Sequence, residues 1–167
     1  MLSRNATPAD ADGIGAIHAA AFGRDAEAKL VRMLEADGDA LVSLVAGIEG
    51  ARVGHVLFSR MTVNADGEPV AAAGLAPLGV LPSYQGLGIG SALIREGLSL
   101  LSTLGIRQCF VLGHPNYYSR FGFRVETAAP YLSPYAGPHF MALALDSALP
   151  LPERGRADYA PAFARLG

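Results

Sequence analysis

The residues with the clearest chemical meaning are three glycines at alternate positions, Gly86, Gly88 and Gly90. They follow an apolar stretch that ends at Val80 and precede a helical pattern of apolar residues. Glycine has no Cβ atom, so successive backbone N–H groups can turn toward one point and a bulky anion can approach them closely. The N-terminus of the following helix adds unpaired N–H donors and the positive end of its dipole. The segment therefore predicts a site for phosphate or pyrophosphate.

Two common nucleotide-binding motifs do not fit this segment. A Walker loop needs Gly-Lys-Ser/Thr, and the only lysine of the chain is Lys29. The dinucleotide fingerprint Gly-x-Gly-x-x-Gly requires glycine where Ser91 stands, and an acidic residue about 20 positions later. The region from Gly105 to His114 contains no acidic residue.

A third pattern fits. Gln85-x-x-Gly88-x-Gly90 resembles the acyl-coenzyme A pyrophosphate loop of the GNAT superfamily of N-acetyltransferases. About 30 residues later, beyond a short apolar stretch, Tyr118-x-x-x-Gly122-Phe123 resembles the second landmark of that family. The resemblance covers nearly the whole domain, up to residues 139–145, and looks closest to bacterial proteins described as predicted N-acetyltransferases.

The resemblance implies roles for individual residues. Tyr118 corresponds to the tyrosine that hydrogen-bonds the thioester sulfur and protonates the departing thiolate. The strands that contain Val80 and Leu112 are expected to diverge, with the acetyl group in the gap between them. The residues implied to bind acetyl-CoA are Leu78, Gly79 and Val80 along the pantetheine arm, Gln85, Gly86, Leu87, Gly88, Ile89, Gly90 and Ser91 around the pyrophosphate, and Asn116 near the arm.

The implied reaction is direct attack by a primary amine on the thioester of acetyl-CoA, without a metal ion. A backbone N–H near Val80 or Leu81 would polarise the carbonyl oxygen. The base that accepts the proton of the amine is open between His114 and a water relay. The alternative is a catalytically weak module that binds acyl-CoA and senses the acyl pool. The acceptor is also open between a small-molecule amine and a peptide amine, and a homodimer is one oligomeric state that the resemblance allows.

The predicted loop departs from the commoner family pattern at two positions. Gln85 stands where arginine is frequent, and Leu87 stands where lysine or arginine is common. The loop therefore carries no formal positive charge, and backbone N–H groups are expected to bind the pyrophosphate, with Arg95 or Arg120 as nearby cations. On the acceptor side, residues 131–135 are predicted to line the site. Glu27 is interpreted as a solvated helix charge, and the alternative is that it binds a substrate amine.

The elements that must position these residues follow from periodicity. The alternation of apolar residues predicts helices at 8–22, 25–36 and 88–104, one or two helical turns at 116–120, and strands at 41–48, 52–63, 70–80, 107–112, 121–125 and 139–145. This order predicts an α+β or α/β fold, and the resemblance specifies one GNAT-like domain with a mostly antiparallel, splayed central sheet flanked by helices. The domain is expected to cover residues 1–150, with a C-terminal tail at 151–167.

Composition limits the partners and the compartment. The chain has 167 residues, 51% hydrophobic and 17% charged, which excludes a disordered protein. The net charge is −2 and the basic residues form no run of three, so neither nucleic acid nor a membrane is expected as the main partner. The single cysteine, Cys109, excludes an internal disulfide and fits a reducing, cytoplasmic location.

Overall fold

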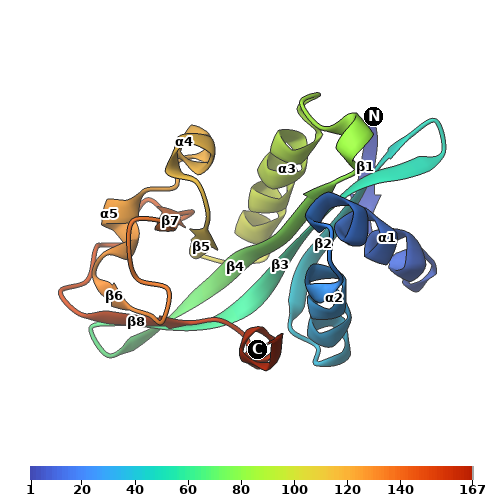
Figure 1. Ribbon diagram of the computed structural model, residues 1–167. Helices are drawn as coiled ribbons and strands as arrows, with labels where there is room; N and C mark the ends of the chain where they lie inside the picture. The colour runs from blue at the N-terminus through green and yellow to red at the C-terminus, as the bar shows by residue number, and fades with distance from the viewer. Residues whose placement is uncertain (167) are drawn as a thin grey trace.

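The computed structural model of the protein describes residues 1–166. An eight-stranded mixed sheet forms its centre (Figure 1). The strand order is β1-β2-β3-β4-β5-β7, with β8 paired to β3 and β6 paired to β8. All neighbours are antiparallel except β4–β5 and β6–β8, so the prediction of a mostly antiparallel sheet is confirmed. The strands are β1 (Leu2–Asn5), β2 (Ala40–Ile48), β3 (Ala51–Ala65), β4 (Glu68–Val80), β5 (Gln108–Leu112), β6 (Tyr131–Leu132), β7 (Phe140–Ala144) and β8 (Gly155–Asp158).

Helices cover both faces of this sheet. Helices α1 (Ala11–Phe22) and α2 (Ala26–Ala36) lie on one face, and α3 (Ile89–Thr103) lies on the other (Figure 1). The predicted apolar side of α3 is buried from Leu93 to Leu101, but Leu104 follows the last helical residue and is 57% exposed. The shorter helices are α4 (Pro115–Tyr118), α5 (Val125–Ala128) and the 3-10 turns η1 (Pro8–Asp10), η2 (Pro82–Tyr84), η3 (Ser119–Phe121) and η4 (Pro161–Leu166).

Strands β4 and β5 diverge after a short parallel contact. Only Ala72–Gly74 pair with Gln108–Phe110, whereas β4 continues beside β3 as far as Val80. In the β3–β4 ladder Val56 pairs with Leu78 and Phe58 with Leu75, so Ala76 and Pro77 together oppose a single β3 residue. Such a β-bulge bends the strand that carries the extra residue. The last six residues of β4 therefore have a partner on one side only.

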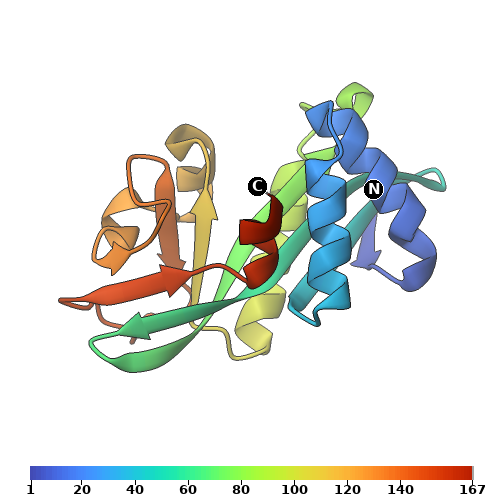
Figure 2. The ribbon, with the colours of Figure 1, turned by 60° about the horizontal axis from the view of Figure 1, so that its bottom comes forward.

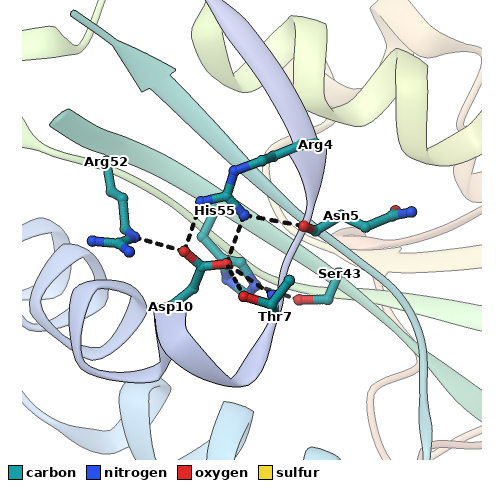
Figure 3. Close-up of polar contacts among 7 residues, drawn as sticks. All are labelled: Arg4, Asn5, Thr7, Asp10, Ser43, Arg52 and His55. Atoms are coloured by element: carbon teal, nitrogen blue, oxygen red, sulfur yellow. Dashed lines mark hydrogen bonds and ion pairs between the residues drawn. The ribbon is translucent and has the colours of Figure 1, made fainter. Parts of the chain in front are cut away.

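A buried carboxylate anchors α1 to the sheet (Figure 3). Asp10 is 1% exposed, and its oxygens accept hydrogen bonds from Arg4 of β1, Arg52 of β3 and the backbone N–H of Thr7. The bidentate Arg4 contact and the Thr7 bond hold the pKa of this carboxyl well below its usual range. Three separate elements are thereby fixed around the start of α1.

The segment after residue 150 corrects the expectation of a tail. Strand β8 extends the sheet by pairing with β3, and Ala157, Ala160 and Ala162 are buried (Figure 2). Three prolines, at 150, 152 and 161, give this stretch the appearance of an irregular end, but the four residues of β8 lie between them and pair with both β3 and β6.

The predicted strand at 121–125 is also wrong. Gly122 has a φ of 98° and ends the 3-10 turn before it, Arg124 forms an isolated bridge to Ala142, and Val125 begins α5.

Residues 69–94 contain no charged side chain, and they form most of β4, a loop and the start of α3. None of the helices within residues 1–166 has the length and apolar character needed to cross a bilayer.

Candidate active site

The loop between β4 and α3 has the backbone that its glycines predict. Gly86 and Gly88 have φ values of 78° and 84°, in the left-handed region that favours glycine. A Cβ atom added at either position would meet no other atom within 4 Å, so backbone conformation alone requires glycine there. Gly88 caps the N-terminus of the 15-residue helix α3, and its neighbours therefore present unpaired N–H groups beside the loop.

A cavity of about 350 Å³ lies against this loop, and we call it the loop cavity. Tyr84, Tyr117 and Arg120 complete its lining. Gly79, Leu87 and Asn116 are absent from it: Leu87 is 67% exposed, and Gly79 faces α1. The structure brings together there eight of the eleven residues predicted to bind the cofactor, namely Leu78, Val80, Gln85, Gly86, Gly88, Ile89, Gly90 and Ser91.

Polar contacts hold the walls of the loop cavity in place. The Gln85 side chain donates a hydrogen bond to the Val80 carbonyl at 2.9 Å, which ties the loop to the end of β4. The hydroxyls of Ser91 and Tyr117 are 3.3 Å apart. Arg120 lies over the Tyr117 ring, 5.6 Å from its centroid, and supplies the only cationic side chain in the lining.

The end of β4 offers free backbone groups to the gap. The Leu81 N–H donates to the Val53 carbonyl of β3 at 2.8 Å. Consecutive residues of an antiparallel strand direct their backbone groups to opposite sides, so the N–H groups of Leu78 and Val80 point away from β3. Strand β5 has already diverged at this level, and an extended ligand can pair with that edge.

A second cavity, of about 430 Å³, lies beside the same strand end, and we call it the aromatic cavity. Tyr118 lines it, whereas the preceding Tyr117 lines the loop cavity, and their rings meet edge to face at 5.0 Å. Leu78 borders both cavities. Burial raises the pKa of Tyr118 to about 12, so its hydroxyl stays protonated at neutral pH.

Comparison with known proteins identifies the family of this chain. The sequence model of the Acetyltransferase (GNAT) domain matches residues 3–125. The chain belongs to the GNAT family of acetyltransferases. It is 45% identical to the N-acetyltransferase YjhQ of Escherichia coli over 116 residues, which are 68% of this chain and 64% of YjhQ, so the match spans less than two thirds of that relative.

Two solved GNAT structures resemble the whole chain. The crystal structure of the Escherichia coli N-acetyltransferase YhbS in complex with CoA is 35% identical, with a TM-score of 0.86 over 99% of this chain and 93% of YhbS. A GNAT acetyltransferase of Brucella melitensis in complex with acetyl-CoA is 36% identical, with a TM-score of 0.79 over 97% of each chain. The predicted family and fold are confirmed, as is the prediction that the chain belongs among acetyltransferases.

Other residues singled out in the sequence fall in different places in this GNAT domain. Tyr135 lines the aromatic cavity as predicted, but Tyr131 is buried elsewhere and donates its hydroxyl to Gln108 at 2.9 Å. Glu27 is no solvated charge, because its side chain is 15% exposed, lines the aromatic cavity and bonds Arg24. His114 is exposed, lies beside His139 and lines neither cavity.

Sequence reasoning missed the part of the site that comes from the end of the chain. Tyr159, Phe163 and Leu166 line the aromatic cavity. The last two belong to η4, which packs beside α2 (Figure 2). The Tyr159 ring lies against Gly74, where β4 and β5 begin to diverge, and a Cβ atom at Gly74 would come within 2.5 Å of it. The only signal in the sequence is two aromatic residues four positions apart, which does not indicate a partner.

Proposed function

We propose that this GNAT protein transfers the acetyl group of acetyl-CoA to a primary amine by direct attack. The observation that carries the proposal is the junction at the end of β4. There the loop cavity, the free strand edge and the aromatic cavity with Tyr118 lie side by side, so that a donor and an acceptor can meet. Holding two reactants in this way supplies much of the rate of a bimolecular reaction.

The residues of the loop cavity suit an elongated anionic donor. The left-handed glycines and the N-terminus of α3 present N–H groups for a diphosphate. The free N–H groups of Leu78 and Val80 suit the amides of the pantetheine arm. The CoA and acetyl-CoA complexes of the two related structures support the same assignment.

Two groups of the chain act on the reacting atoms in this proposal. The Val80 N–H is the donor for the thioester oxygen, because Leu81, the other candidate, already donates to Val53. As the amine nitrogen bonds to the carbonyl carbon and the carbon–sulfur bond breaks, Tyr118 donates its proton to the departing thiolate and then regains a proton from water. Water takes the proton of the amine, since His114 lies outside both cavities.

The adjacent tyrosines provide a matched test. We expect Tyr118→Phe to lower kcat at least tenfold while the KM for acetyl-CoA changes little, because a general acid contributes about 10²–10⁴-fold. Tyr117→Phe, in the loop cavity, should raise that KM and leave kcat within about twofold. Thiol release from acetyl-CoA in the presence of an amine panel measures both parameters.

The opposite pattern, a loss of kcat in Tyr117→Phe alone, would reverse the assignment. Thermal stabilisation by acetyl-CoA without thiol release from any amine would instead indicate the acyl-CoA-binding module. Ligand at 100 times its Kd stabilises a protein by about 2.7 kcal/mol, which a melting curve detects.

A further inference from the structure

The chemistry of the aromatic cavity indicates which amines the proposed reaction accepts. Its volume of about 430 Å³ lies toward the lower end of cavities that enclose small-molecule ligands, about 300–1,000 Å³. The first helix pair, the end of β4 and the C-terminal turn η4 contribute to its walls. A cavity of this size, built from separate segments, suits a compact ligand.

The charges around this cavity cancel. Among the residues that the structure describes, Arg24 and Glu27 are the formally charged ones in the lining, and they bind each other through two hydrogen bonds of 2.9 and 2.6 Å. The guanidinium of Arg24 holds the pKa of Glu27 below its usual range, so the pair stays ionised and satisfied. A ligand with several ammonium groups would bury positive charges, and the described lining residues offer them no free carboxylate, which is unfavourable.

The other lining residues are all aromatic or aliphatic, and five of them carry aromatic rings. Phe22, Tyr118, Tyr135, Tyr159 and Phe163 all line the cavity. Tyr159 meets Tyr135 edge to face at 5.4 Å and Phe163 at 4.8 Å between ring centroids, so three of the rings form one continuous wall. Such a wall packs favourably against an apolar or aromatic body, and its ring faces attract a single arriving ammonium.

We propose that the acceptor is a compact monoamine with an aromatic or otherwise apolar body, bound in the aromatic cavity with its amine toward Tyr118. This inference rests on the proposed function. Polyamines, aminoglycosides and lysine side chains of peptides are then poor acceptors. The last segment of the chain, through Tyr159 and Phe163, selects among amines.

Thiol release with four acceptors tests the class: 2-phenylethylamine, spermidine, kanamycin and a lysine-containing peptide. We expect kcat/KM for 2-phenylethylamine to exceed each of the others at least tenfold. Equal or faster reaction with any of the other three would overturn the acceptor class while leaving the proposed transferase intact. If no acceptor releases thiol, the transferase fails, and titration calorimetry of 2-phenylethylamine into the protein with CoA then tests the cavity; no binding there overturns this proposal too.

Variants test the wall and the charge balance separately. Phe22→Ala and Tyr135→Ala should raise the KM for 2-phenylethylamine at least fivefold without changing the KM for acetyl-CoA. The matched control is Leu132→Ala, because Leu132 ends β6 three residues before Tyr135, is 69% exposed and does not line the cavity. Phe22 is 41% exposed, so its variant is expected to fold even if Tyr135→Ala does not.

Arg24→Ala leaves Glu27 without its partner and should raise kcat/KM for spermidine at least threefold relative to 2-phenylethylamine. An unchanged ratio would contradict the charge argument. An unchanged KM for 2-phenylethylamine in both aromatic variants would contradict the role of the wall.

Discussion

Two buried histidines determine how this protein responds to acid. His18 and His55 are fully buried, their Nε2 and Nδ1 atoms lie 2.7 Å apart, and Nε2 of His55 lies 2.8 Å from the Ser43 hydroxyl. Burial lowers the pKa of His18 to about 4 and that of His55 to about 3. In an unfolded chain both would titrate near 6.5. The unfolded state therefore binds more protons below pH 6.5, and the free energy of unfolding falls as the pH falls from 6.5 toward 4.

We expect the protein to lose on the order of 2–4 kcal/mol of stability between pH 7 and pH 5, a decrease of roughly 5–15 °C in Tm. Thermal melts at several pH values measure the slope. His18→Gln and His55→Gln should each flatten it, whereas His114→Gln, at an exposed position, should not. A Tm that is the same at pH 5 and pH 7 would contradict the assignment of both histidines as neutral and buried.

At the scale of elements, the two ends of α3 allow a controlled test of the loop. Gly88 and Gly105 have φ values of 84° and 81°, and an added Cβ atom meets nothing within 4 Å at either position. Alanine in the left-handed conformation costs roughly 1–2 kcal/mol. We expect Gly88→Ala and Gly105→Ala to lower Tm by similar amounts.

Only the Gly88 variant should also raise the KM for acetyl-CoA, by about tenfold, because only Gly88 belongs to the loop cavity. Steady-state kinetics and melting curves on the two variants separate the effects. Similar KM values in both would show that the loop backbone does not bind the donor.

The same scale shows what the sequence can predict. The helices at 11–22, 26–36 and 89–103 and the strands β2, β3 and β4 end within a few residues of their predicted bounds, because long periodic segments carry a strong signal. Strands β6 and β8 have two and four residues, and only their distant partners define them. The loop cavity was predictable since most of its residues are nearly consecutive. The aromatic cavity was not, because residues from 22 to 166 meet there only after folding.

For the molecule as a whole, charge predicts how donor binding depends on salt. The net charge is −2, and Arg120 is the only cationic side chain lining the loop cavity. We expect the Kd for acetyl-CoA, measured by titration calorimetry, to rise less than about threefold between 50 and 300 mM salt, because backbone dipoles rather than several ion pairs bind the diphosphate. Arg120→Ala should make the dependence weaker still. A rise of tenfold or more would require further cations that contact the donor.

The C-terminal strand β8 and turn η4 lie outside the segment that the GNAT model matches. Residues 3–125, which the GNAT model matches, contain the glycine loop and most of the lining of the aromatic cavity, whereas Tyr135, Tyr159 and Phe163 lie beyond them. On the proposed function, substitutions confined to residues 159–166 would thus redirect such an enzyme to new amines, while strand β7, which pairs with β5, stays intact. This short segment would then be the place where evolution, or a protein engineer, can change the acceptor without rebuilding the sheet.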